Sequence, residues 1–269
     1  MNGQPIPILL YHSVSEHTSG DFAPYAISPS AFVEHLDLIV DRGHRTLTVT
    51  DLVDRLARGE ALPERPVVIT FDDGFADFAE VAWPELAARD LAATLYVTSG
   101  EIGGSSVWLS AEGAGDRPML SWQQLRDLAA AGCEIGAHTL THPPLDCISR
   151  PAAAQEISGC KLQLEDGLGR AVPSFAYPHG HHDRHVRDLV VAAGYESACA
   201  VKNAMSHTGD DRFALARLTV LGDLTTEQLA DQLDGRGVRT APRRERLRTT
   251  AWRTVRRRRH RRSLSSSAP

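Results

Sequence analysis

Apolar residues follow two periods along this chain, one typical of buried strands and one typical of amphipathic helices. Short continuous apolar runs predict strands at 7–11, 66–71, 94–97, 133–137, 174–177, 197–201 and 214–221. Between these runs, apolar residues at helical spacing and capping residues predict helices that start near Ser30, Thr50 or Asp51, Ser121 and Thr225, and helices over 76–89, 151–168 and 184–193. Pro84 predicts a kink or a restart within 76–89.

This alternation predicts an α/β fold, because a helix between two strands allows them to run parallel. We expect one distorted (β/α) barrel of about seven parallel strands, with an open doubly wound sheet as the alternative. The 269 residues suit a single domain of this kind. Residues 99–118 are rich in Gly and Ser, which predicts a long loop over a site.

The charge distribution sets the C-terminal end apart. The net charge is −5, but residues 242–269 hold eleven Arg and one Glu and so carry +10, which leaves −15 for residues 1–241. We expect a catalytic domain over 1–235 and a disordered Arg-rich tail over 236–269. An acidic body argues against nucleic acid as a partner, whereas the tail is suited to contact with an anionic surface.

The location of the protein and the state of its thiols are inferred from what the sequence lacks. No apolar run approaches the roughly 18 residues of a membrane span, and the start lacks the regions of a secretory signal. As written, the chain is expected to be cytoplasmic, with a secreted or cell-surface protein as the alternative if a presequence is missing. The four cysteines form no C-x-x-C pair and predict reduced thiols. A monomer is expected.

Two adjacent carboxylates, Asp72 and Asp73, follow the strand 66–71 directly and precede Gly74. Neighbouring carboxylates repel each other unless one binds a cation or carries a proton. The alternative is an Asp-Asp-Gly turn without a chemical role. Because successive side chains of a strand diverge, one Asp can bind a metal while the other faces a substrate.

Two histidines, His138 and His142, follow the strand 133–137. Pro143 and Pro144 come next, so the pair lies in a turn and not on a zinc-binding helix. One Asp with two His is a ligand set for a divalent metal that leaves positions open for water and substrate. The other Asp is then free to act as a base, which predicts a hydrolytic metal site.

Other polar residues also follow strands. His12 comes after the first strand and is a candidate general acid, with a merely packed or exposed imidazole as the alternative. Arg217 lies inside an apolar run, where a buried guanidinium needs an anionic partner; Asp72 is the candidate, and an Arg that points to solvent is the alternative. His181 and His182 are interpreted as loop residues of the cleft and not as ligands.

Together these motifs resemble the polysaccharide deacetylase family, carbohydrate esterase family 4, also called the NodB-homology domain. Residues 70–74 are similar to its first motif, 138–142 to its second and 175–180 to its third. Residues 10–14 resemble the subgroup related to poly-N-acetylglucosamine deacetylases. The resemblance covers about residues 5–222.

The resemblance implies a role for each site residue. Asp72 would be the general base and His12 the general acid, and the metal ligands would be Asp73, His138 and His142. The metal is expected to be zinc, with nickel, cobalt or iron as alternatives.

The third motif departs from the family pattern, because Ala176 stands at its Arg position and His179 at its aromatic position. Arg217 is therefore expected to replace the missing Arg. The resemblance implies that the His179 backbone N–H stabilises the oxyanion. Tyr177, Pro178 and Gly180 would complete this substrate-binding turn.

The implied activity is hydrolysis of the N-acetyl amide of an acetylated amino-sugar polymer or oligosaccharide, which releases acetate. Two alternatives remain: a deacylase of a soluble N- or O-acyl sugar intermediate, and a sugar-binding pseudoenzyme. The complete set of Asp and His residues argues against the pseudoenzyme.

Overall fold

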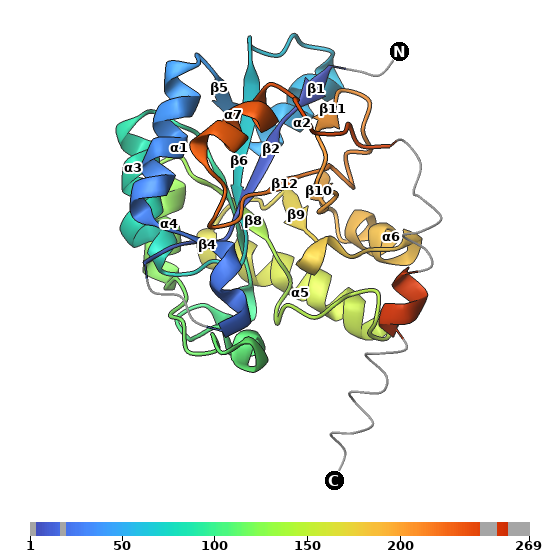
Figure 1. Ribbon diagram of the computed structural model, residues 1–269. Helices are drawn as coiled ribbons and strands as arrows, with labels where there is room; N and C mark the ends of the chain where they lie inside the picture. The colour runs from blue at the N-terminus through green and yellow to red at the C-terminus, as the bar shows by residue number, and fades with distance from the viewer. Residues whose placement is uncertain (1–3, 17–19, 243–251, 258–269) are drawn as a thin grey trace.

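A parallel sheet forms the centre of the molecule. The structure is a computed structural model of the chain and describes residues 4–16, 20–242 and 252–257. The strands are joined in the order β10-β9-β8-β7-β6-β2-β12, and β5 pairs with the start of β6 (Figure 1). They are β2 (Ile8–Tyr11), β5 (Arg45–Leu47), β6 (Pro66–Phe71), β7 (Thr94–Val97), β8 (Glu134–Ala137), β9 (Ser174–Ala176), β10 (Ser197–Cys199) and β12 (Leu218–Thr219). All these pairs are parallel, which confirms the predicted α/β barrel class.

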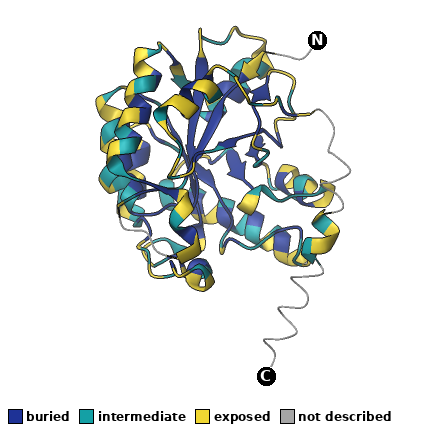
Figure 2. Ribbon diagram, in the orientation of Figure 1, coloured by how far each residue is buried: buried dark blue, intermediate teal, exposed yellow. Residues whose placement is uncertain are grey.

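Helices surround this sheet, and their inner faces bury it (Figure 2). They are α1 (Pro29–Asp41), α2 (Val49–Arg58), α3 (Trp83–Ala88), α4 (Trp122–Ala130), α5 (Arg150–Leu168), α6 (Arg184–Ala192) and α7 (Thr226–Leu233). Every residue of β6 is buried, as expected of a strand covered on both faces. Among the residues the structure describes, no helix has both the length and the apolar character needed to cross a membrane.

Most helix starts agree with their sequence signals. Ser121 and Thr225 cap α4 and α7, as predicted, and the structure adds that each forms a capping box. Helix α2 starts earlier than predicted, because the Thr48 side chain accepts from the Asp51 N–H and so makes Thr48 the cap. Pro84 falls in the first turn of α3, directly after a π-helical turn at Phe78–Ala82, so the helix restarts there as expected.

The smaller elements lie at the two ends of the sheet. They are the antiparallel pair β1 (Pro5–Ile6) with β11 (Ser206–His207), the parallel pair β3 (Ser13–Val14) with β4 (Ala26–Ile27), and the 3₁₀ turns at Gly20–Tyr25, Ser99–Glu101, Val107–Glu112 and Pro178–Gly180. Two of these turns interrupt the segment 99–118, which was predicted to be one long loop. All four cysteines carry free thiols, as expected.

The segment 214–219 joins the two edges of the sheet. Leu215 bridges to Cys199 of β10, and Leu218 pairs with Leu9 of β2. Only Leu218 and Thr219 form a strand, which is shorter than the predicted run 214–221. Because the segment passes from one edge to the other, the sheet curls into a distorted barrel. Arg217 lies between the two contacts and is fully buried.

Gly136 in β8 makes room for the Tyr96 ring inside the barrel. A Cβ added at Gly136 would lie 2.5 Å from two ring atoms of Tyr96, which is itself fully buried. We expect Gly136→Ala to lower the free energy of unfolding by about 1–3 kcal/mol, the usual cost of overpacking. Urea unfolding measures this change. Gly104→Ala is the matched control, since its Cβ would meet only the Glu101 carbonyl, at 3.4 Å; equal losses in both variants would contradict the packing argument.

The structure moves the boundary of the C-terminal tail. Residues 236–242 were expected to belong to the tail, but they pack on the domain: the Ala241 N–H donates to the Met205 carbonyl at 2.8 Å, and Ala241 is buried beside Ala204 and Ala216. Residues 252–257 are helical and contact the domain. The rest of the predicted tail, 243–251 and 258–269, lies outside the described residues.

Candidate active site

The carboxyl end of β6 brings both carboxylates to the same place. Asp72 and Asp73 are each 3% exposed. Asp73 has a left-handed backbone with φ of 78°, and Gly74 follows with φ of 89°. A left-handed turn at a non-glycine residue is strained and is typical of functional sites. The turn redirects the Asp73 side chain, so the two carboxylates do not diverge as they would in a continued strand.

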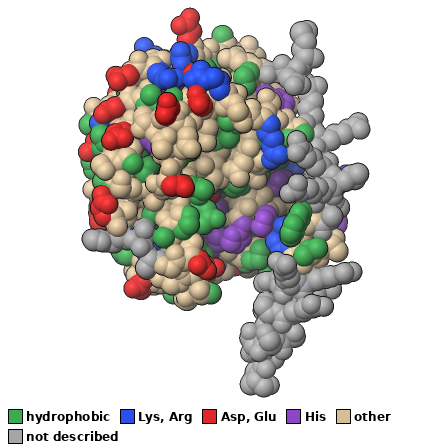
Figure 3. Space-filling model, viewed as in Figure 1, with side chains coloured by type: hydrophobic (Ala, Val, Ile, Leu, Met, Phe, Trp, Pro, Cys, Tyr) green, Lys and Arg blue, Asp and Glu red, His purple; other side chains and the backbone are tan. Residues whose placement is uncertain are grey.

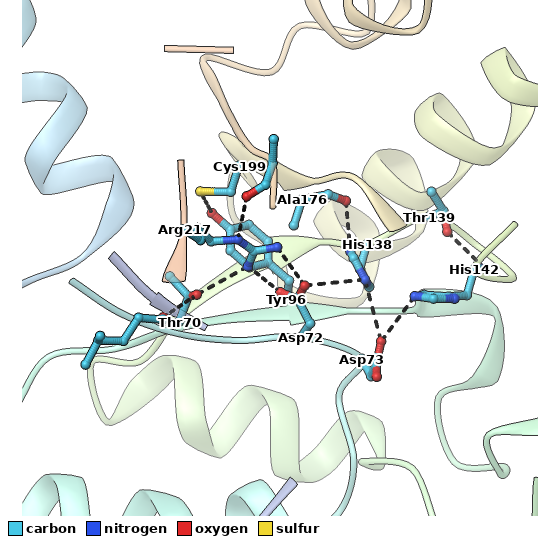
Figure 4. Close-up of polar contacts among 12 residues, drawn as sticks. Thr70, Asp72, Asp73, Tyr96, His138, Thr139, His142, Ala176, Cys199 and Arg217 are labelled. Carbon is cyan, nitrogen blue, oxygen red and sulfur yellow. Dashed lines mark hydrogen bonds and ion pairs between the residues drawn. The ribbon is translucent and has the colours of Figure 1, made fainter. Parts of the chain in front are cut away.

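His138 and His142 converge on Asp73 from the loop after β8 (Figure 4). The two Nε2 atoms lie 3.5 Å and 3.4 Å from Asp73 Oδ1. The Nδ1–H of His138 donates to the Ala176 carbonyl at 2.8 Å, which leaves the Nε2 lone pair directed at the carboxylates. His142 has φ of 60°, and its backbone N–H donates to Thr139 Oγ1 at 3.0 Å.

These three residues fit a divalent cation. One ligand atom from each lies within 4.8 Å of the others. Asp73 Oδ1 is buried and has no hydrogen-bond partner within the described residues. Burial lowers the pKa of both histidines, so both imidazoles are neutral at neutral pH and each has one nitrogen lone pair free for a metal, whereas burial and Asp72 raise the pKa of Asp73 well above its usual value. A cation between them would remove this electrostatic conflict.

Asp72 is paired with Arg217, as the sequence predicted. Its two carboxylate oxygens accept from Arg217 Nη1 at 2.6 Å and Nη2 at 2.7 Å. Burial alone would raise the pKa of Asp72, but Arg217, with smaller contributions from His138 and His12, outweighs burial and lowers it. Arg217 also donates to the Ala200 carbonyl at 3.2 Å and to Thr70 Oγ1 at 3.2 Å. Asp72 is thus an ionised carboxylate in a fixed position beside the ligand triad.

Arg217→Met should destabilise the fold, because it leaves the buried Asp72 carboxylate without its cation. We expect the free energy of unfolding at pH 7 to fall by about 3–5 kcal/mol. The depressed pKa of Asp72 stabilises the wild type above the usual carboxyl range, and this contribution is lost on acidification. The difference between the two proteins should therefore shrink as pH falls through about 4.

The control for this variant is Arg187→Met, which breaks a second bidentate pair, with Asp211, whose side chains are 34% and 43% exposed. An exposed pair of this kind contributes about 0–1 kcal/mol. Urea titrations at several pH values measure both variants. Losses of equal size would show that burial of the Arg217 pair has no energetic consequence.

His12 reaches the same cleft from the end of β2. Its ring contacts Tyr25, with centroids 5.1 Å apart, and Phe22, at 6.4 Å. Burial lowers the pKa of His12 to about 4; Asp72 opposes this shift and Arg217 adds to it. The imidazole is therefore neutral in the free protein at neutral pH.

The turn at 177–180 is only partly as expected. His179 has φ of 56° and lies against His142, with ring centroids 4.8 Å apart. Gly180 has φ of 69°, and a Cβ there would lie 2.3 Å from the Val201 nitrogen. Tyr177 and Pro178 are buried, however, and the Tyr177 hydroxyl donates to the Phe213 carbonyl at 2.9 Å. Neither of these two residues lines the cleft, so the expected contact with substrate is not supported for them.

A cleft of about 1090 Å³ opens beside the triad and is lined by His12, Asp72, Asp73, His138, His142 and His179. Figure 3 shows histidine side chains gathered in a hollow of this face. Sequence reasoning did not single out three aromatic residues near it. Phe22 and Tyr25 line the cleft, and Trp108 stacks on His142 with centroids 5.3 Å apart. The available signal was a Trp within the Gly/Ser-rich segment 99–118.

The fold and this site define a hydrolase with a buried Asp-His-His triad at the carboxyl end of a parallel barrel. Residues 59–198, about half of the chain, match the polysaccharide deacetylase family. The chain belongs to that family and is a hydrolase of the carbohydrate deacetylase class.

Relatives with assigned names agree with this family. YxkH of Bacillus subtilis, whose name places it among the polysaccharide deacetylases, is 24% identical over 215 residues, which are 80% of this chain and 71% of YxkH. The poly-beta-1,6-N-acetyl-D-glucosamine N-deacetylase of Escherichia coli is 26% identical over 144 residues, which are 51% of this chain but only 21% of that protein.

A solved structure supports the fold. The Streptococcus pyogenes deacetylase PplD, solved in complex with acetate, superposes with a TM-score of 0.74 and 24% identity. The match covers 86% of this chain and 99% of PplD. At this level of identity the likeness supports the architecture alone.

Proposed function

We propose that this protein is a metal-dependent deacetylase that hydrolyses the N-acetyl group of an acetylated amino sugar in an oligosaccharide or polymer and releases acetate. The observation that carries the proposal is the convergence of Asp73, His138 and His142 beside the Arg217-bound Asp72. The named N-deacetylase among the relatives supports an N-acetylated saccharide as the substrate.

Asp73, His138 and His142 would hold a divalent metal, and their ligand types suit zinc. When bound, the cation supplies Lewis-acid polarisation of the acetyl carbonyl and lowers the pKa of a water molecule. Asp72 takes the proton from the attacking water, because Arg217 keeps its carboxylate ionised and fixed in position. The His179 backbone N–H stabilises the negative charge that develops on the carbonyl oxygen.

His12 donates a proton to the nitrogen of the leaving amine. Its imidazole is neutral in the free protein, so it takes up a proton from solvent during the reaction, as negative charge develops on the substrate beside it. Asp72 releases the water's proton to solvent and is ionised again. Overall, one water and one amide give acetate and one protonated amine, and both Asp72 and His12 return to their starting states.

Acetate release from N-acetylglucosamine oligomers tests the proposal. Release should stop after treatment with a chelator and return with added Zn²⁺. Release from O-acetylated but not N-acetylated sugars would instead favour the ester-cleaving alternative. No release from either class, by protein that contains zinc, would contradict the proposal.

His12→Ala is expected to lower kcat for the amide substrate by about 10²–10⁴, the usual contribution of a general acid. Hydrolysis of an aryl acetate should change far less, because a phenolate leaves without protonation. The ratio of the two rates therefore isolates the acid role within one variant. An equal loss on both substrates would mean that His12 acts on attack or binding and not on the leaving group.

A further inference from the structure

The helical segment 252–257, which we call the clasp, binds two loops of the candidate site. The first loop, residues 138–149, carries His138 and His142 and ends at the cap of α5. The second loop, residues 177–183, carries His179 and ends at the cap of α6. Each follows its own strand, β8 or β9, and the clasp comes from far along the chain to contact both (Figure 1).

Asp146 is the anchor in the first loop. Its side chain is fully buried, and its ion pairs in the described part of the chain come from the clasp, from Arg253 and Arg256. Arg256 contacts both carboxylate oxygens, and Arg257 Nε donates to the Asp146 carbonyl at 2.6 Å. A buried carboxylate without a cation is costly. The clasp supplies the cations that pair with Asp146, and these ion pairs hold the first loop against the clasp.

The same side chains hold the second loop. Arg253 donates to the His182 carbonyl at 2.9 Å, and Arg257 pairs with Asp183. Asp183 also caps α6, since its Oδ1 accepts from the Val186 N–H at 2.9 Å. The clasp therefore links the two loops through groups that are themselves fixed in place.

The two loops meet at the candidate metal site. The His142 ring from the first loop lies against the His179 ring from the second. Both residues have left-handed backbones, a strained conformation that persists only where the surroundings impose it. A link that fixes the two loops relative to each other supplies such a constraint.

We infer that the clasp is part of the catalytic domain, and that Asp146, Arg253 and Arg256 are positioning residues that hold His142 and His179 in place for metal binding and for the oxyanion. The inference rests on the proposed function for its catalytic consequence, but not for the link between the loops. Part of the Arg-rich C-terminal segment would thus hold two loops of the protein's own active site in place.

The test compares two triple variants of the full chain. The clasp triple carries Arg253→Gln, Arg256→Gln and Arg257→Gln. The control triple carries Arg55→Gln, Arg58→Gln and Arg236→Gln, which removes the same charge from exposed arginines whose ion pairs, such as those with Glu60 and Asp231, involve neither loop. The readouts are the Zn²⁺ dissociation constant, measured by competition with a chromogenic chelator, kcat and KM on an N-acetylglucosamine oligomer, and hydrogen exchange of 139–147 and 177–183 in metal-free protein.

We expect the clasp triple to weaken Zn²⁺ binding by about 10–100-fold, as loss of outer-shell support usually does, and to lower kcat more than it changes KM. Exchange in both loops should become faster. For the control triple, zinc affinity, kcat and KM should each stay within about twofold of the wild-type values. Equal effects of the two triples, or no effect of the clasp triple, would overturn the inference.

Asp146→Asn tests the anchor from the other side. It should weaken zinc binding and speed exchange in the two loops, as the clasp triple does. The variant that combines both changes should lose less zinc-binding free energy than the sum of the two separate losses, because both changes remove the same interaction. Additive losses would show that Asp146 and the clasp act separately. If the wild type binds zinc but releases no acetate, the proposed function fails, while zinc affinity and hydrogen exchange still test the link between the loops. If the wild type binds no zinc, hydrogen exchange alone tests that link.

Discussion

His138→Ala is expected to lose the bound metal and, with it, nearly all deacetylation. The variant removes one of three ligand atoms that lie within 4.8 Å of one another and leaves Asp73 and His142 as an incomplete set. Lewis-acid stabilisation amounts to several kcal/mol, and each 1.36 kcal/mol is a factor of ten in rate, so kcat/KM should fall by about 10³ or more. Elemental analysis of dialysed protein measures the metal, and acetate release measures the rate.

His179→Ala is the matched control for metal content. Its ring lies 4.8 Å from that of His142, so it is a second imidazole of the same cleft, but it is outside the ligand triad. This variant should keep the metal. If His138→Ala retained as much metal as His179→Ala, the ligand assignment would be wrong.

Metal affinity should weaken as pH is lowered, and mainly through one ligand. Burial and Asp72 raise the pKa of Asp73 well above its usual value, so protons compete with the cation there first. The pKa values of His138 and His142 are lowered, so protons compete with the metal for these two imidazoles only at lower pH. A zinc titration at several pH values measures this dependence, and an affinity that did not change with pH would contradict it.

Much of the fold could be predicted because its signals are local. The apolar run 66–71 is a strand with those same bounds, and Ser121 and Thr225 cap helices as expected. The strand predicted over 214–221 was harder, because its pairing is divided between two distant edges of the sheet: Leu215 bridges to β10, and only Leu218 and Thr219 pair with β2. Periodicity cannot show such a contact.

The candidate site, like the fold, could be predicted from the sequence only in part. Arg217 could be matched to Asp72 because a charge within an apolar run requires a partner, which is a property of the sequence itself. The left-handed turn at Asp73 could not be predicted, since only the surrounding fold imposes that conformation on a non-glycine residue. Trp108 and the clasp reach the site across long distances in the chain, so their spacing carried no signal.

Asp72→Asn is expected to keep the metal and lose turnover. The amide is close in shape to the carboxylate but cannot accept a proton from water, so kcat should fall by about 10²–10⁴, the usual contribution of a general base. Asp72 is not in the triad, and its Oδ2 lies 3.7 Å from His138 Nε2. Metal analysis and kcat measured on the same preparation separate the two properties.

The change has a second consequence that must be separated from catalysis, because the neutral amide would leave the Arg217 guanidinium buried without an anion. This should lower stability by a few kcal/mol, as breaking a buried pair does. The folded fraction at the assay temperature must therefore be measured, and kcat expressed per folded molecule.

Asp72→Asn combined with Arg217→Met removes both charges and should recover part of the stability but none of the rate. If the double variant regained activity along with stability, Asp72 would be a structural partner of Arg217 and the base would have to be another group; if Asp72→Asn lost its metal, Asp72 and Asp73 would exchange roles.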